Sequence, residues 1–295
     1  MVSKKIAAAI AIIVIIAIIA VAAQQFWMQK PKAEEVEIKI GLLVDLSGPL
    51  ASLGEDIRDT CLIGVEDINA YFAEKGQPYR VKLFIEDTKV DPKVALDKVQ
   101  ALHGKGVTLI LGPMGSGEIK QIAEYVTANK IIIVSASSTA IPQLLGITKP
   151  EERKFIFRFV PTDAFQTEAI AREAADLGIK GVIITYQGNA WGKGLTDFSK
   201  IKLEAGGIEV KDAIEYSDPP PADFTPYIAV MEKDLNELLQ KYDKTQIAII
   251  AFSYGEVYTM LSQVDVKSPL FEVKWLGCDG TAKDRKIADI PEKVN

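Results

Sequence analysis

The chain has 295 residues, 34 basic and 40 acidic side chains, a formal net charge of −6, one histidine and two cysteines. With 48% apolar residues it is long enough to build about two domains with hydrophobic cores, which excludes a disordered chain. The negative charge has the wrong sign for a protein that follows a phosphate backbone, so no nucleic-acid partner is expected. One histidine and two cysteines are too few for a tetrahedral zinc site, and neither a metal nor another cofactor is expected.

The N-terminal residues differ in composition from the rest of the chain. Lys4 and Lys5 precede an apolar run, Ile6–Ala23, that contains no charge, glycine or proline. Its length is at the lower limit for spanning a hydrocarbon core of roughly 30 Å, and its last residues are small enough for a signal-peptide cleavage site. Residues 1–28 are therefore predicted to be either an uncleaved membrane anchor or a cleaved signal peptide, followed by a polar tether at 29–36. In both cases the rest of the chain is extracytoplasmic, either anchored at the cell surface or secreted or periplasmic.

From Glu37 onward, short β-branched runs alternate with amphipathic helical stretches. The first four predicted strands are Ile38–Val44, Val81–Glu86, Val107–Leu111 and Lys130–Val134. The helix after the first strand is predicted to begin with a capping box of Ser52 and Glu55, the next is capped by Asp91, and the third begins near Ser116. Strands separated by helices pair in parallel through right-handed crossovers.

The same pattern restarts in the second half of the chain, beginning with a strand at Phe155–Val160 and a helix capped by Asp163. The further strands are Gly181–Thr185, Ile208–Ile214, Gln246–Phe252 and Val273–Leu276, with later helical stretches at 194–204, 226–241 and 256–263. Two such series predict an α/β protein with two doubly wound parallel-sheet lobes, at 37–156 and 157–295, preceded by the N-terminal hydrophobic helix.

A ligand is expected at the loops that follow the strands, because parallel sheets bind ligands at their carboxyl ends. In the first lobe these loops are rich in glycine and hydroxyl groups. Ser116 lies at a predicted helix N-terminus, and Ser137, Ser138 and Thr139 follow the fourth strand. Backbone amides and the helix dipole favour a carboxylate there. Serine, threonine and glycine are also ordinary turn and capping residues, so these loops alone leave a purely structural role open.

The second lobe offers groups of the opposite character. Trp191 and Tyr254 can form apolar walls, and Asp279 can hold a cation. A carboxylate site on one lobe and an acid on the other would suit a zwitterion. As isolated residues, the two aromatics equally fit core or rim packing, and Asp279 fits a turn beside Gly280.

Several stretches taken together resemble the periplasmic leucine/isoleucine/valine-binding protein family. They are Gly41–Gly54, Val65–Asn69, Glu86–Pro92, Gly112–Ser116 and Trp191–Gly194. The resemblance extends from Glu37 to Asn295. It implies the type I periplasmic-binding-protein fold, whose two lobes close on one small-molecule ligand, and it implies an ABC permease with its ATPases as partners.

The resemblance also implies roles for individual residues. Ser116 and Thr139 would hydrogen-bond the α-carboxylate of an amino acid, assisted by backbone groups around Ser137. Asp279 and the carbonyl of Ser137 would hold the ammonium group.

Trp191 and Tyr254 would line the wall of the second lobe. Leu53 and Trp191 differ from the residues that are usual in the family, so specificity for branched aliphatic side chains stays open. Family members usually continue well beyond the Asp279–Gly280 loop. The chain is therefore expected to be a fragment, a truncated reading frame or a shortened member, with an incomplete second lobe.

Two alternatives to an import receptor remain: the ligand-sensing domain of a membrane-anchored signalling system, and a binding protein for an amide, a short peptide or an aromatic acid. An enzyme is not expected. A Gly-x-Ser-x-Gly hydrolase motif needs glycine two places before Ser116, where Met114 stands. Gly115-x-Gly117 lacks the third glycine of a dinucleotide fingerprint.

Overall fold

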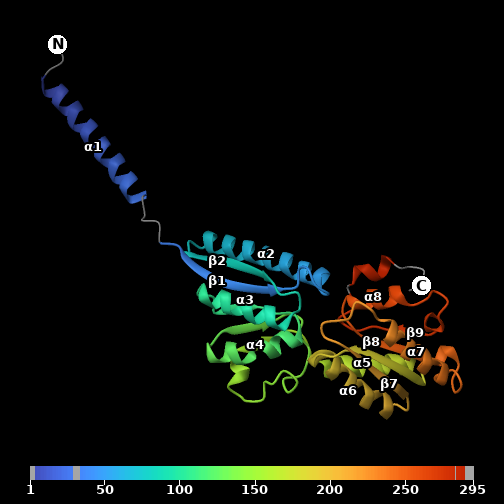
Figure 1. The fold of residues 1–295 in the computed structure, drawn as a ribbon. Helices are drawn as coiled ribbons and strands as arrows, with labels where there is room; N and C mark the ends of the chain where they lie inside the picture. The colour runs from blue at the N-terminus through green and yellow to red at the C-terminus, as the bar shows by residue number, and fades with distance from the viewer. Residues whose placement is uncertain (1–3, 29–33, 283, 290–295) are drawn as a thin grey trace. The chain divides into compact units, whose positions relative to one another are not determined.

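A computed structural model describes residues 4–28, 34–282 and 284–289 (Figure 1). The chain divides into two compact units, one built from 1–38 with 69–80 and the other from 39–68 with 81–295. Most of the tether predicted at 29–36 lies outside the described residues. The second unit contains nearly all of both predicted lobes and is the one that carries the candidate site.

The first unit includes one long helix, α1 (Lys4–Met28), which contains the apolar run. The side chains of this helix are described for residues 12–24, and they are exposed. Within the residues that the structure describes, no helix is long and apolar enough to cross a membrane.

The first sheet has five strands in the order β2-β1-β3-β4-β5. Its strands are β1 (Val36–Val44), β2 (Tyr79–Asp87), β3 (Leu109–Leu111), β4 (Ile132–Ser135) and β5 (Ile156–Arg158). Its helices are α2 (Ala51–Glu74), α3 (Pro92–Gly104), α4 (Ser116–Ala128) and the 3-10 turn η1 (Glu152–Lys154). Strands β1, β3, β4 and β5 pair in parallel. Apolar side chains of α3 and α4 pack on one face of this sheet, and those of α2 pack on the other.

The second sheet has four parallel strands in the order β7-β6-β8-β9. Its strands are β6 (Gly181–Gln187), β7 (Glu209–Tyr216), β8 (Ile247–Phe252) and β9 (Lys274–Leu276). Its helices are α5 (Asp163–Asp176), α6 (Ala190–Ala205), α7 (Thr225–Leu238) and α8 (Glu256–Gln263), with 3-10 turns η2 (Lys244–Gln246), η3 (Pro269–Phe271) and η4 (Arg285–Asp289). Helices α5 and α6 cover one face of this sheet, and α7 covers the other.

The predicted α/β architecture of two parallel-sheet lobes is confirmed, with one difference in strand pairing. The strand expected to begin the second series, β5, pairs with β4 and forms the edge of the first sheet, with Phe157 opposite Val134. A run of β-branched and aromatic residues predicts a strand but does not identify its neighbour. The crossing to the second sheet therefore follows β5 and leads directly into α5.

The start of α2 also differs from the prediction. The helix begins at Ala51, so Ser52 lies inside its first turn and the predicted capping box is wrong. The fully buried Asp45, at the end of β1, accepts hydrogen bonds from three backbone N–H groups of the following turn, including that of Leu50 at 2.6 Å. These bonds order the chain before the helix. The predicted cap at Asp91 is confirmed, because its carboxylate accepts from two N–H groups of α3.

Candidate ligand-binding site

The loops at the carboxyl ends of the two sheets line one cavity of about 590 Å³. Six of the seven residues predicted from the sequence lie in its lining: Ser116, Ser137, Thr139, Trp191, Tyr254 and Asp279. The remaining lining residues are Leu50, Leu53, Ile57, Met114, Ala136, Val160, Pro161, Thr162, Asp163, Phe165, Gln166 and Gly280. The seventh predicted residue, Ser138, is buried outside this lining, and its Oγ lies 2.9 Å from the Oγ of Ser116.

The first-sheet side of the cavity is built at the N-terminus of α4. As predicted, Ser116 is the first helical residue, and Gly115 is its N-cap. The Oγ of Ser116 accepts a hydrogen bond from the N–H of Ala140 at 3.2 Å, and the Oγ of Ser137 donates to the carbonyl of Met114 at 3.0 Å. These bonds hold the loop after β4 against the start of α4, where the helix dipole favours an anion.

Thr139 brings a buried hydroxyl group that lies beside the carboxyls of Asp163 and Asp279. Its Oγ1 is buried and makes no hydrogen bond with any residue that the structure describes. Its backbone carbonyl accepts a hydrogen bond from the N–H of Asp163 at 3.0 Å, which fixes the loop against the first residue of α5. A buried hydroxyl without a partner is costly, so this one is well placed to bond a ligand.

On the second-sheet side, Trp191 and Tyr254 form a stacked pair. Their ring centroids are 4.4 Å apart at an interplanar angle of 20°, and the residues are only 2% and 5% exposed. Asn189 caps α6 and accepts from the N–H of Trp191 at 3.1 Å, which fixes the backbone that carries the indole. Gly280 permits this packing, because a Cβ there would lie 2.7 Å from the Tyr254 ring and 2.9 Å from the Trp191 ring. The pair gives the cavity a rigid apolar wall.

Asp279 lies in the loop after β9. Its N–H donates to the Oε1 of Gln166 on α5 at 2.8 Å, and its Oδ1 accepts from the N–H of Gly280 at 2.9 Å. The residue is exposed, and desolvation of its carboxyl by the surrounding groups raises its pKa. Gln166 therefore positions the loop that carries the predicted cation-binding acid, a role that the position of Gln166 in the sequence does not indicate.

A second acid in the lining, Asp163, was missed as a site residue. The sequence predicts that it caps α5, whereas Thr162 is the N-cap and Asp163 is the first helical residue. Asp163 is 1% exposed, and neither of its carboxyl oxygens makes a hydrogen bond within the part of the chain that the structure describes. Burial, and to a smaller extent the nearby charge of Asp279, raise its pKa to about 7. Acids at helix starts are so often caps that the sequence position of Asp163 alone does not identify it as a site residue.

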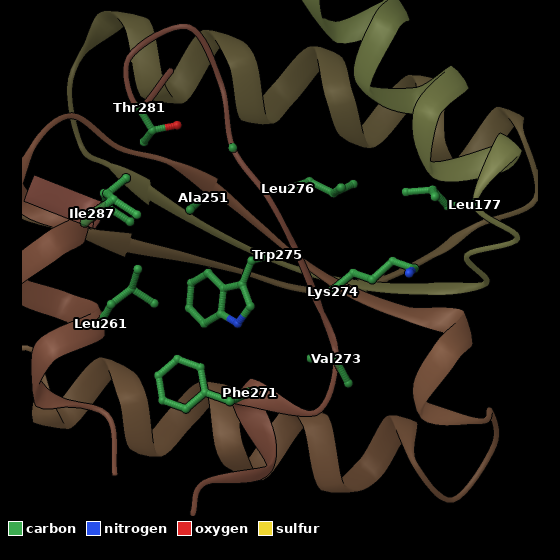
Figure 2. A pocket seen from close by; sticks show the side chains of 12 residues that line it. Leu177, Ala251, Leu261, Phe271, Val273, Lys274, Trp275, Leu276, Thr281 and Ile287 are labelled. Atoms are coloured by element: carbon green, nitrogen blue, oxygen red, sulfur yellow. The ribbon is translucent and has the colours of Figure 1, made fainter. Parts of the chain in front are cut away.

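The second-sheet lobe has another cavity, of about 570 Å³, beside β9 (Figure 2). Figure 2 shows Leu261, Phe271 and Trp275 lying on one side of this cavity. Among the described residues in its lining, polar groups come from Lys274, Thr281 and the indole N–H of Trp275. We call this cavity the apolar cavity, and the one that contains Asp163 and Asp279 the polar cavity. Among the described residues, no group of three or more His, Cys, Asp or Glu side chains is arranged to hold a metal ion.

Comparison with known proteins agrees with this architecture. A family model described as "Periplasmic binding protein" matches residues 37–234. An uncharacterized protein of Methanocaldococcus jannaschii is 49% identical over 257 residues, which are 87% of this chain and 60% of that protein. The Leu/Ile/Val-binding protein BraC3 of Rhizobium johnstonii is 30% identical over 187 residues, which are 62% of this chain and 48% of that protein. The chain thus spans about half to three fifths of the length of these two relatives.

Solved structures share the fold. The branched-chain amino acid transporter substrate-binding protein LivJ from Streptococcus pneumoniae, in complex with isoleucine, aligns with a TM-score of 0.65 at 20% identity, covering 83% of this chain and 65% of that one. A solute-binding protein from Rhodopseudomonas palustris, in complex with 3,4-dihydroxybenzoic acid, aligns with a TM-score of 0.60 at 22% identity, covering 82% of this chain and 61% of that one. The chain belongs to the periplasmic binding protein family, as a type I member related to the Leu/Ile/Val-binding proteins.

Proposed function

We propose that this chain is an extracytoplasmic solute-binding protein that captures an amino acid in the polar cavity for an ABC importer. The observation that carries the proposal is the pairing of opposite chemistries in one cavity. The N-terminus of α4 with the free hydroxyl of Thr139 suits a carboxylate, and the carboxyl of Asp279 suits an ammonium group. An α-amino acid carries both groups on one carbon.

The rest of the lining suits an aliphatic side chain. Leu50, Leu53, Ile57 and Met114 lie on the first-sheet side of the polar cavity, opposite the stacked aromatic pair. Burying a Leu, Ile or Val side chain against such a surface contributes roughly 1.5–3 kcal/mol. The related BraC3 is named a Leu/Ile/Val-binding protein, and LivJ was solved with isoleucine. A branched-chain amino acid is therefore the ligand that we propose.

An aromatic acid is the second candidate. The stacked Trp191 and Tyr254 offer a flat surface to a ring, and the Rhodopseudomonas palustris protein was solved with a dihydroxybenzoic acid. Such a ligand has a carboxylate but no ammonium group. It would leave Asp279 without a cationic partner, which makes it the less favourable fit.

In the proposed mechanism the ligand bridges the loops of the two sheets. It stabilises the closed arrangement only by the difference between its affinities for the closed and open states. The closed protein would then be recognised by the permease, and no covalent bond is made or broken. Lys4 and Lys5 before the apolar run of α1 support export, with this N-terminal segment either cleaved or retained afterwards. Mass spectrometry of the N-terminus in the membrane and soluble fractions distinguishes these two fates.

The test is a thermal-shift screen of the full chain, in detergent, against the twenty amino acids, small peptides and hydroxybenzoic acids. A ligand at a hundred times its dissociation constant adds about 2.7 kcal/mol of stability. We expect a shift with leucine, isoleucine or valine. A shift with hydroxybenzoic acids and none with any amino acid would refute the proposal.

The matched variants are Asp279→Asn and Asp176→Asn. Asp279→Asn removes the charge that would face the ammonium group, and we expect it to weaken binding more than tenfold, since hydrogen bonds to charged groups contribute about 1.5–3 kcal/mol. Asp176 is an exposed acid at the other end of α5, so its substitution should leave the dissociation constant unchanged. Equal affinities of the two variants would contradict the role of Asp279.

A further inference from the structure

Asp163 is a buried acid whose partner is missing from the protein. Its side chain is 1% exposed and lines the polar cavity, yet neither oxygen is hydrogen-bonded by a described residue. Thr139 and Gln166 lie close enough to lower its pKa in part, but they do not offset the cost of burial. A carboxyl without hydrogen bonds is among the most costly groups to bury, so its retention in a cavity wall points to a partner that arrives from outside.

The charged groups around Asp163 identify what kind of partner fits. On β5, the guanidinium of Arg158 donates to the carbonyl oxygens of Ser138 and Ala140 at 3.1 and 2.7 Å, so its hydrogen bonds are directed to the backbone. The loop after β9 contributes the carboxyl of Asp279, which repels a charge on Asp163.

The remaining titratable neighbours are neutral. On this side of the cavity, Tyr254 and Cys278 both have pKa values raised by burial and by Asp279, so neither supplies a positive charge. Among the described residues, two acids thus face one space, and the nearby cation Arg158, whose charge lowers the pKa of Asp163 in part, is hydrogen-bonded to the backbone. A ligand that supplies a positive charge would relieve both burial and repulsion.

We propose that Asp163 is a second acceptor of the ligand's ammonium group, together with Asp279, and that the empty site keeps a proton on this pair of acids which the ligand expels. This inference rests on the proposed function, because it requires a ligand with an ammonium group. The balance is simple: the carboxylic acid of Asp163 loses H⁺ to solvent, its carboxylate receives the R–NH₃⁺ group, and the ammonium group keeps all three of its protons.

Two consequences distinguish this arrangement from a single acid that is always charged. Below about pH 7 the affinity for an ammonium ligand should rise up to tenfold for each pH unit, because one proton is released per ligand bound. Above that pH the affinity should become independent of pH. A ligand without an ammonium group should expel no proton.

The experiment is isothermal titration calorimetry of the full chain with L-isoleucine at pH 6 and pH 8.5, in buffers of different ionisation enthalpy. The dependence of the heat on the buffer gives the number of protons released. We expect close to one proton at pH 6 and close to none at pH 8.5. In Asp163→Asn the release at pH 6 should disappear and the affinity should no longer depend on pH, whereas Asp176→Asn should behave like the native chain.

The possible results separate the two proposals. Binding of isoleucine without proton release, or release that persists in Asp163→Asn, overturns the role of Asp163 and leaves the proposed function standing. Binding of 3,4-dihydroxybenzoate with no binding of any amino acid overturns the proposed function, and the inference with it. Proton counting on the native chain decides the question even if the variant does not fold, and Asp163→Ser supplies a second variant.

Discussion

The polar and apolar cavities have nearly the same volume, about 590 and 570 Å³, but they pose different physical problems. The apolar cavity is lined by hydrocarbon and the aromatic side chains of Phe271 and Trp275, with Lys274 exposed and the hydroxyl of Thr281 bonded to Cys278. The polar cavity contains a hydroxyl and a carboxyl that are buried without partners among the described residues. Size alone therefore does not separate a binding site from a packing defect, whereas two unpaired polar groups that line the same cavity favour a binding site.

The buried acids Asp45 and Asp163 show the same difference between a polar group that the fold satisfies and one that it does not. Asp45 is even less exposed than Asp163, but its carboxylate accepts three backbone N–H bonds and orders a turn. Asp45 is thus satisfied within the fold. Asp163 is buried to a similar extent and lacks such bonds, so its burial has to be explained by something other than folding.

The largest expected effect follows from the pKa of Asp163, which is about 7 in the folded chain against 3.8 for an ordinary aspartate. Between these pH values the folded chain binds a proton that the unfolded chain has released, so the free energy of unfolding falls as the pH rises. The fall due to this group is about 4 kcal/mol at most. In Asp163→Asn, without ligand, we expect a flatter dependence on pH and a more stable protein at pH 8, measured by urea unfolding at pH 4.5 to 8.

Glu118 provides the control for this prediction. It is also buried, its pKa is raised to about 7 by burial, and it lies outside the lining of the polar cavity. Its contribution to the pH dependence has the same sign and should persist in Asp163→Asn. If the free energy of unfolding of Asp163→Asn changed with pH as steeply as that of the native chain, Asp163 would have to be charged in the folded protein at neutral pH.

Much of the fold could be predicted from the sequence because its signals are local. The strands of both sheets are short apolar runs, and Asp91 before Pro92 marks a helix start that the structure retains. The pairing of β5 was not predictable, because a strand of three residues carries no information about which sheet will accept its edge. The start of α2 was misplaced because Asp45, several residues upstream, bonds the turn that precedes the helix.

The candidate site was predictable to the extent that its residues stand directly after strands or at helix starts. Ser116, Thr139 and Asp279 fulfil that condition and line one cavity. Asp163 also stands at a helix start, but there it was interpreted as a cap, and Gln166 lies inside the same helix, which reaches the cavity only after the chain crosses from one sheet to the other. Whether a buried acid is satisfied depends on contacts between segments that are distant in the sequence.

The apolar cavity should respond to mutation through stability alone. Trp275 is half-buried there, packs against the core and donates from its Nε1 to the carbonyl of Leu270 at 2.8 Å. Trp275→Ala removes this packing and should lower the free energy of unfolding by about 2–4 kcal/mol, somewhat less than for a fully buried tryptophan. Urea unfolding measures this loss of stability. Calorimetry under conditions in which the variant is still folded should give an unchanged affinity for isoleucine. A large loss of affinity in this variant would mean that the two cavities are coupled.

The smallest expected effect concerns the glycine that permits the aromatic wall of the polar cavity. In Gly280→Ala the new methyl group would lie 2.5 Å from the carbonyl oxygen of Ser253 and 2.7 Å from the Tyr254 ring, so the stacked pair has to shift. Such overpacking costs about 1–3 kcal/mol and should weaken isoleucine binding as well. Gly64→Ala is the matched control, since nothing lies within 4 Å of a Cβ at that position in α2. It should raise the stability by about 0.5–1 kcal/mol without changing affinity. If the midpoint temperature of thermal unfolding shifted in the same direction in both variants, the wall of the polar cavity would not depend on close packing at Gly280.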